Sequence, residues 1–275
     1  LPGSPKSVER FIRHPFKVVV RMLQVKFFKR LSFLVRIKTF FGYPMLIHSF
    51  EYYLWFGSCL TSIEFALQKF IIKYYDTQGV FLDVGAHHGY YTLLAHKLIM
   101  SEGGKGEIHA FEPTDIHYGI LEKNVDGLSQ ITLNKKAVCG TSGKRTFYEN
   151  IKGKSTIEKA LFRDVPSSQD DIFTSIEVDC TTLDEYCTEH HINPTFIKID
   201  VEGSEYEVLR GAAHILTHET PIISLEAWSR PYDNHNHIKA IALLKEYGYH
   251  ASQIDQSGDR VPISYEALYA LLEQP

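Results

Sequence analysis

The chain has 275 residues, of which 44% are hydrophobic and 23% charged, so it is long enough for one large domain or two small ones. This composition excludes a wholly disordered or collagen-like chain. The formal net charge of −4 conceals an asymmetry, because residues 1–40 carry ten basic side chains and one acid, whereas the rest carries 19 basic and 32 acidic side chains. The sequence therefore divides into a basic N-terminal segment and an acidic remainder.

The basic segment has a pattern compatible with a helix over residues 8–41. Four of its bases recur at intervals of three or four residues and so share one helical face. These are Arg10, Arg13, Lys17 and Arg21. A basic amphipathic helix can lie on an anionic membrane surface, and it can equally pack on the main domain or on a second subunit. We predict a basic, mainly helical N-terminal extension over residues 1–64, with both roles left open.

The sequence also bears on compartment. The longest weakly charged stretch, residues 40–60, contains Glu51, two glycines and a proline, so we do not expect a spanning helix there. The four cysteines are widely spaced and form no C-x-x-C pair, which is typical of reduced thiols in the cytosol. We expect a cytoplasmic protein, with peripheral contact at the inner face of a membrane through residues 8–41 as a further hypothesis.

From residue 80 onward, short apolar strands alternate with helices. The strands are predicted at residues 80–86, 107–111, 131–138, 144–148, 176–178, 196–200, 221–227 and 250–254, and the helices at 90–100, 115–125, 183–191, 204–216 and 238–247. This alternation is typical of βαβ units. We therefore predict a doubly wound α/β domain over residues 65–275, with a mostly parallel sheet and helices on both faces.

The residues after the first predicted strand form a D-x-G-x-x-x-G loop that includes Asp83, Gly85 and Gly89. Gly85 permits a tight turn and close backbone approach. A dinucleotide fingerprint would need glycine at position 83. The carboxylate found there instead would repel a pyrophosphate, but it could bind an ammonium or balance a sulfonium.

Further acids follow other predicted strands. Glu112 lies 27 residues beyond Gly85 and is placed to accept the ribose hydroxyls of a nucleoside, whether from NAD or from S-adenosylmethionine. Asp200, Glu202 and Glu205 crowd the end of the strand at 196–200. Acids in a first helical turn favour the helix dipole, which accounts for Glu202 and Glu205 but not for Asp200.

Six motifs together resemble the FkbM family of S-adenosylmethionine-dependent methyltransferases over residues 80–228. They are F-L-D-V-G-A-H-H-G-Y-Y-T, A-F-E-P, K-K-A-V, T-T-L-D-E-Y, I-K-I-D-V-E-G-S-E-Y-E-V-L-R-G-A and I-I-S-L-E. The resemblance implies a class I, Rossmann-like fold with a seven-stranded sheet, S-adenosylmethionine as cofactor and S-adenosylhomocysteine as product. It also implies O-methylation of a sugar or similar hydroxyl.

The resemblance further implies a set of cofactor-binding residues. These are Asp83, Gly85, Ala86, His87, Gly89, Glu112, Pro113, Ala137 and Asp200. The chain departs from the family pattern at His87, where asparagine is common.

A hydroxyl is a poor nucleophile, so we expect a general base. Asp200 is the first candidate, Glu202 the second, and His88 a third because it lies on the cofactor loop. Mg²⁺ on Asp200, Glu202 and Glu226 is an alternative that we do not favour. The expected partner is a hydroxylated metabolite, glycan or glycolipid. We expect no nucleic acid, and an oligomer is compatible with the sequence.

Two other function classes remain open from the residues alone. The first is an NAD-dependent oxidoreductase, because Glu112 suits either nucleoside, although Asp83 argues against it. The second is a non-catalytic methyltransferase-like module that binds a partner through its basic segment.

Overall fold

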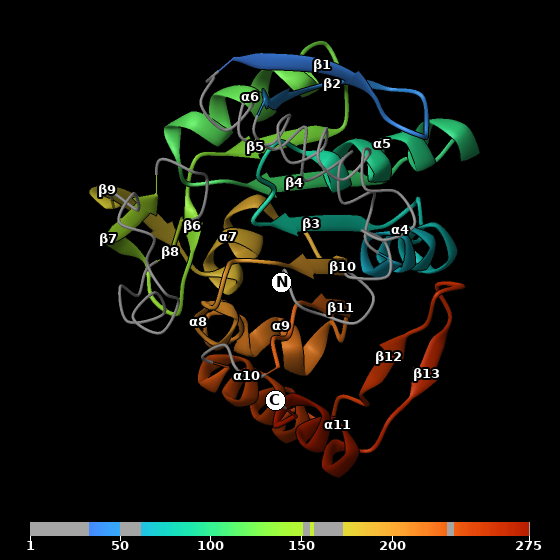
Figure 1. Cartoon of the computed structure of the whole chain (residues 1–275), viewed down its shortest axis with the longest axis vertical. Helices are drawn as coiled ribbons and strands as arrows, with labels where there is room; N and C mark the ends of the chain where they lie inside the picture. Colours follow the sequence, from blue (N-terminus) through green and yellow to red (C-terminus); the bar gives the residue numbers. More distant parts are fainter. Residues whose placement is uncertain (1–32, 50–61, 151–154, 157–172, 230–233, 275) are drawn as a thin grey trace, which may run out of the picture. The chain divides into compact units, whose positions relative to one another are not determined.

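The computed structural model describes residues 33–49, 62–150, 155–156, 173–229 and 234–274 (Figure 1). Residues 1–32, which include the basic face expected to be helical, lie outside the described residues. The chain divides into two compact units, residues 1–64 and residues 65–275.

In the first unit, β1 (Leu34–Lys38) and β2 (Pro44–His48) form an antiparallel hairpin. Val35 and Ile37 are half-buried, whereas the residues that flank them in the strand are exposed. This period of two is that of a strand. The helix expected through residue 41 is therefore wrong over residues 34–38, because apolar and basic side chains alternate singly from Val35 to Lys38.

The second unit is built on an all-parallel sheet with the strand order β11, β10, β3, β4, β5 (Figure 1). Its strands are β3 (Val80–Val84), β4 (Glu107–Phe111), β5 (Ile131–Asn134), β10 (Pro194–Ile199) and β11 (Ile222–Leu225). They are short and largely apolar because helices cover both faces. This arrangement confirms the predicted doubly wound α/β fold.

The sheet has five strands in the described part of the chain, not the seven that were expected. The last predicted strand, β12 (Ser252–Ile254), pairs with β13 (Arg260–Pro262) in a separate antiparallel hairpin. The side chains of both strands are mostly exposed, so neither has the apolar faces that a central strand buries.

One face of the sheet packs against α4 (Ser62–Tyr74) and α5 (Tyr90–Glu102). Phe81 of β3 stacks on Phe196 of β10 with ring centroids 5.1 Å apart, and Phe70 of α4 lies 5.8 Å from Phe196. Because strand side chains alternate between faces, the residues two positions further along, Asp83 and Lys198, point to this same face.

The opposite face packs against α7 (Leu183–His190), α8 (Glu205–Arg210) and α9 (Ala213–His218). Leu82 and Ile197 belong to the buried core on this side. The remaining helices are α6 (Asp115–Val125), α10 (His235–Glu246) and α11 (Tyr265–Leu272). None of the helices that the structure describes combines the length and apolar character of a bilayer span.

Two predicted elements are broken in the structure. The helix expected at 204–216 is split into α8 and α9 at Gly211, where an added Cβ would lie 2.3 Å from the carbonyl oxygen of Cys139. The strand expected at 131–138 ends at Asn134, and residues 137–138 form β6 (Ala137–Val138) in a second sheet. Lys135 is exposed at the break.

The second sheet has the strand order β6, β9, β7, β8. It comprises β6, β7 (Gly143–Asn150), β8 (Ser155–Thr156) and β9 (Phe173–Thr181), with β7 antiparallel to β9. Most of the predicted loop at 153–171 lies outside the described residues. Ala137 and Val138 of β6 and Phe147 of β7 line a pocket at the carboxyl end of the central sheet. The second sheet thus forms one wall of the candidate site.

Candidate cofactor and acceptor site

The candidate site lies where the order of strands reverses. From β3 the chain proceeds outward to β4 and β5, and it then returns to place β10 on the other side of β3. The loops after β3 and β10 therefore diverge, which opens a crevice at the carboxyl ends of the strands. Gly85, Glu112, Asp200 and Glu226 each follow one of these strands directly.

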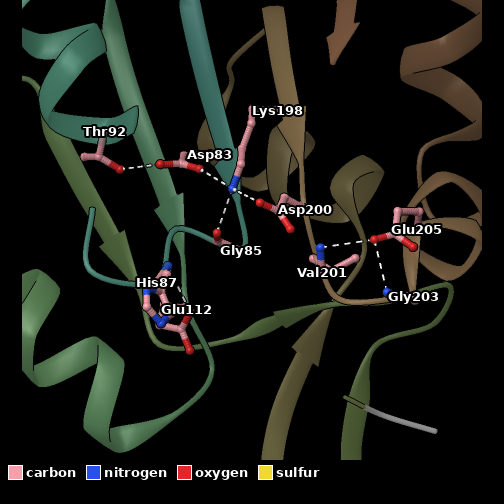
Figure 2. A network of polar contacts seen from close by, with 10 residues as sticks. All are labelled: Asp83, Gly85, His87, Thr92, Glu112, Lys198, Asp200, Val201, Gly203 and Glu205. Atoms are coloured by element: carbon pink, nitrogen blue, oxygen red, sulfur yellow. Dashed lines mark hydrogen bonds and ion pairs between the residues drawn. The ribbon is translucent and has the colours of Figure 1, made fainter. Parts of the chain in front are cut away.

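Lys198 is the centre of a buried polar network at this point (Figure 2). Its Nζ lies 3.3 Å from Asp83 Oδ1 and donates to the carbonyl oxygen of Gly85 at 2.8 Å. The same Nζ is 3.7 Å from Asp200 Oδ2, and Thr92 Oγ1 donates to Asp83 Oδ2 at 2.6 Å. One lysine thus links the ends of β3 and β10.

This network changes the expected role of Asp83. The Asp83 side chain is fully buried and its charge is balanced by Lys198, which is 3% exposed. Asp83 was expected to face the cation of the cofactor. In the structure its carboxylate instead contacts Lys198 and Thr92. Sequence reasoning did not list Lys198 as a site residue, although a lysine inside the apolar strand I-K-I was a signal for it.

Gly85 is the point of closest approach between the two loops. It has a φ of +78°, and an added Cβ would lie 1.9 Å from the carbonyl oxygen of Asp200. The amides of Gly85 and Ala86 both donate to the carbonyl oxygen of Phe111 at the end of β4. Only glycine fits this position.

Glu112 fixes the loops on either side of it. Its Oε1 accepts from the amide and the hydroxyl of Thr114, at 3.0 and 2.7 Å, and its Oε2 accepts from the amide of His87 at 3.0 Å. A carboxylate has about four acceptor positions, so three contacts leave capacity for one more donor. The structure thus brings the predicted ribose acid and the cofactor loop together (Figure 2).

A pocket opens beside these groups, between the ends of β3 and β4 and the second sheet. Its wall is mostly apolar and includes several predicted cofactor residues. It is lined by Val84, Gly85, Phe111, Pro113, Lys136, Ala137, Val138, Phe147, Val201 and Ser204. Such a surface suits a planar aromatic ring such as adenine.

The loop after β10 is shaped by a buried acid. Glu205 Oε1 accepts from the amides of Val201 and Gly203, both at 3.2 Å, and the residue between them, Glu202, has a φ of +53° (Figure 2). Burial raises the pKa of Glu205 to about 7. The carboxylate predicted as a first-turn acid therefore holds the loop that carries Asp200 and Glu202.

His237 of α10 contacts the other oxygen of this carboxylate. Its Nδ1 lies 3.3 Å from Glu205 Oε2, and both side chains are fully buried. The H-x-H pair at 235–237 has no zinc-site motif around it, so both histidines are expected on the surface; this is correct for His235 but wrong for His237, which is fully buried. A single sequence could not distinguish the two, because burial depends on α10 packing against α8.

Glu226 joins the carboxylates at the end of β11. It forms side-chain hydrogen bonds with Asp200 and Trp228, and its burial, together with the charges of Asp200 and Glu202, raises its pKa well above the usual range. Within the described residues, these three acids do not form a group close enough to share one ion. The alternative of Mg²⁺ on Asp200, Glu202 and Glu226 is therefore not supported by their positions.

His88, the third candidate base, lies elsewhere. Its side chain is 1% exposed, and its Nε2 is 3.0 Å from Nδ1 of His117 in α6. The structure therefore places His88 in a cluster with His117 and not with Asp200 and Glu202. Gly89 has a φ of +87° and begins α5, where an added Cβ would meet Leu121.

The fold is a Rossmann-like α/β domain with a mostly apolar pocket and several carboxylates at the carboxyl ends of its parallel strands. Residues 83–251, more than half of the chain, match the family model described as the methyltransferase FkbM domain. The chain belongs to the FkbM methyltransferase family, and its α/β unit is an S-adenosylmethionine-dependent methyltransferase domain. This confirms the resemblance seen in the motifs.

Among curated proteins, the chain is similar to methyltransferase sdnD of Sordaria araneosa, with 26% identity over 159 residues. The match covers 47% of this chain and 59% of the relative, so the chain spans less than two thirds of that relative's length. Among solved structures, it is similar to a precorrin-6Y C5,15-methyltransferase from Geobacter metallireducens GS-15 (TM-score 0.40, 16% identity, 69% of this chain and 73% of that chain). A second is an S-adenosylmethionine-dependent methyltransferase from Agrobacterium tumefaciens (TM-score 0.38, 11% identity, 78% and 59%).

Proposed function

We propose that this protein transfers the methyl group of S-adenosylmethionine to a hydroxyl of a sugar, glycan, glycolipid or related metabolite. The observation that carries the proposal is the group of acids at the ends of β10 and β11, where Glu226 is buried close to the charges of Asp200 and Glu202. An acidic group of this kind can accept the proton of a hydroxyl, which is a poor nucleophile unless a base assists it.

The residues present fit the cofactor. The apolar wall formed by Phe111, Pro113 and Val138 suits the adenine, and Glu112 retains acceptor capacity for a ribose hydroxyl. The carboxylates of Asp200 and Glu202, which follow β10, favour a cation at this edge of the sheet. When bound, S-adenosylmethionine supplies an electrophilic methyl group on a positively charged sulfur.

The residues of the chain would then position the acceptor and take its proton. Because the pKa of Glu226 is raised, it keeps its proton and donates to Asp200, which orients the Asp200 carboxylate. Asp200 would accept the proton of the acceptor hydroxyl as its oxygen takes the methyl group, with the methyl–sulfur bond broken and S-adenosylhomocysteine as the leaving group. Trp228, which is hydrogen-bonded to Glu226, offers an aromatic face beside this pair, and such a face suits stacking on a sugar ring.

The cofactor assignment is tested by calorimetry with S-adenosylhomocysteine. Replacement of Glu112 by Gln should weaken binding roughly 10–100-fold, because a hydrogen bond to a charged group contributes about 1.5–3 kcal/mol. The exposed Glu122, changed to Gln, is the matched control and should bind as wild type does. A wild-type chain that binds NADH but not S-adenosylhomocysteine would overturn the proposal.

The transfer step is tested with S-adenosylmethionine labelled in its methyl group and a panel of sugars, oligosaccharides and glycolipids. Asp200→Asn should lower the turnover rate by roughly 10²–10⁴-fold, the contribution of a positioned base, while S-adenosylhomocysteine still binds. Labelling of a nitrogen or carbon acceptor, with no hydroxyl acceptor labelled, would refute O-methylation. Cofactor binding without transfer to any acceptor would favour a non-catalytic module.

A further inference from the structure

Three histidines form a cluster between α6 and the loop that follows β3. His87 and His88 belong to the loop between β3 and α5, and His117 lies in the first turn of α6. One coordinating nitrogen from each ring can be chosen so that all three lie within 4.8 Å of one another. In the part of the chain that the structure describes, no other three or more His, Cys, Asp or Glu side chains meet this closely.

The distances are close to those of a metal centre. Zn–N bonds of about 2.0–2.1 Å in a tetrahedral site place two ligand nitrogens about 3.3 Å apart. His88 Nε2 and His117 Nδ1 are 3.0 Å apart already. The ring of His87 has its centroid 4.0 Å from that of His88 and 4.1 Å from that of His117. Because an imidazole coordinates a metal in the plane of its ring, the stacked His87 ring has to turn before its nitrogen points at the same ion.

The protein holds this cluster in place through its backbone. The amide of His87 donates to Glu112, and Asn124 of α6 donates to the carbonyl oxygen of His88 at 2.8 Å. His87 has a φ of +53°, a left-handed conformation that is uncommon outside glycine but that histidine adopts more readily than most residues. His88 and His117 are 1% and 3% exposed, so two of the three ligands are desolvated before any ion arrives.

We propose that His87, His88 and His117 form a binding site for a transition-metal cation of the zinc class. Imidazole nitrogens suit Zn²⁺, Co²⁺, Ni²⁺ and Cu²⁺, whereas Mg²⁺ and Ca²⁺ take oxygen ligands. Three imidazoles leave a further coordination position for water or another ligand. The ion ties the cofactor loop to α6, next to Glu112. The site does not depend on the transfer chemistry, because its ligands lie apart from the carboxylates at Asp200.

The test uses the full chain, free of any histidine tag and stripped with a chelator. The stripped protein is loaded with Zn²⁺ or Co²⁺, passed through a desalting column and assayed for metal content. We expect one ion per chain and, for Co²⁺, the visible absorption bands of a low-coordinate ion with nitrogen ligands. Removal of a residue that only hydrogen-bonds a metal ligand weakens metal binding roughly 10–100-fold. His88→Leu and His117→Gln each remove a ligand, so each should weaken Zn²⁺ binding by more than this.

The matched control is the double variant His214→Ala/His218→Ala. These two histidines are exposed, stack 4.2 Å apart on α9, and offer a pair of imidazoles outside the proposed site. The control should retain the full metal content, and circular dichroism should show that every variant is folded. His87→Asn, at the least buried of the three positions, replaces any variant that does not fold.

Four results would overturn the proposal. The first is a wild-type chain that retains no ion, and the second is triad variants that bind Zn²⁺ as tightly as wild type. The third is a control that loses the ion while the triad variants keep it. Stoichiometric Mg²⁺ in place of Zn²⁺ would also contradict it, since the proposed ligands are nitrogens.

Discussion

At the scale of single residues, Lys198 is buried and lies between two acids, of which Asp83 is fully buried and Asp200 is 42% exposed. Removal of one partner of a buried ion pair leaves the other charged and unsolvated, which costs about 3–5 kcal/mol. Lys198→Met should therefore lower the free energy of unfolding by about that amount, since Asp83 is fully buried. Urea unfolding monitored by circular dichroism measures the change.

Two comparisons separate this effect from the loss of side-chain volume. Lys144→Met removes a lysine from an exposed pair with Glu177 and should leave stability close to that of wild type. Asp83→Asn combined with Lys198→Met should recover much of the stability, because no buried charge is left unpaired. A double variant as unstable as Lys198→Met alone would show that the ion pair is not the cause.

Gly85 offers a second prediction at this scale. Gly85→Ala should lower stability by more than Gly127→Ala does, although both residues have a positive φ, +78° and +74°. The left-handed conformation costs an alanine about 1–2 kcal/mol at either position. Only at Gly85 does the added Cβ meet backbone, at 1.9 Å from Asp200. Equal melting temperatures for the two variants would contradict the close approach of the two loops.

At the scale of elements, Glu205 and His237 join α8 and α10 to the loop that carries Asp200. The pKa of Glu205 is raised from 4.5 to about 7 by burial, so the folded chain binds this proton more tightly than the unfolded chain does. Its contribution to stability is therefore complete below about pH 4.5 and is lost as the pH rises through 7. Over that range the loss is about 3 kcal/mol.

Glu205→Gln should remove this pH dependence. The measurement is the free energy of unfolding in urea at intervals between pH 4.5 and 8, for wild type and variant. The difference between the two chains isolates Glu205, because Glu226, whose pKa is also raised, is present in both. Glu207→Gln, on the same helix and paired with Arg210, is the control and should follow the wild-type curve. Parallel curves for Glu205→Gln and wild type would refute the role of Glu205.

At the scale of the whole molecule, the N-terminal segment of residues 1–40 is basic and the rest of the chain is acidic. The hypothesis that the basic segment binds a membrane surface can be tested with lipid vesicles. We expect the full chain to bind vesicles that contain an anionic lipid. Replacement of Arg10, Arg13, Lys17 and Arg21 by Gln should weaken that binding roughly a thousandfold, because each base near an anionic surface contributes about 1 kcal/mol. Vesicle sedimentation at low and high salt measures the change.

The matched control removes the same charge from the α/β unit. It replaces four exposed lysines by Gln, namely Lys105, Lys123, Lys144 and Lys245. This variant should bind vesicles as wild type does. A wild-type chain that does not bind anionic vesicles would contradict the membrane hypothesis.

The strand and helix alternation from residue 80 onward was sufficient to predict a doubly wound α/β domain. The bounds of β4 and α6 agree with those predicted, because clear turn and cap residues delimit them. The strand-end acids were also visible in sequence, since each follows an apolar run. The local pattern did not predict the break between α8 and α9 at Gly211. There the backbone lies close to Cys139, which is distant in sequence.

The sequence by itself determined the family through its motifs. It also determined the parallel sheet and the edge at which Gly85, Glu112 and Asp200 gather, because these follow from the periodicity of local segments. Only the tertiary structure decided which polar side chains face one another. The pairing of Lys198 with Asp83, of Glu205 with His237, and of His88 with His117 joins residues 29 to 115 positions apart in the chain. Such contacts depend on strand register and helix packing, which no local pattern encodes.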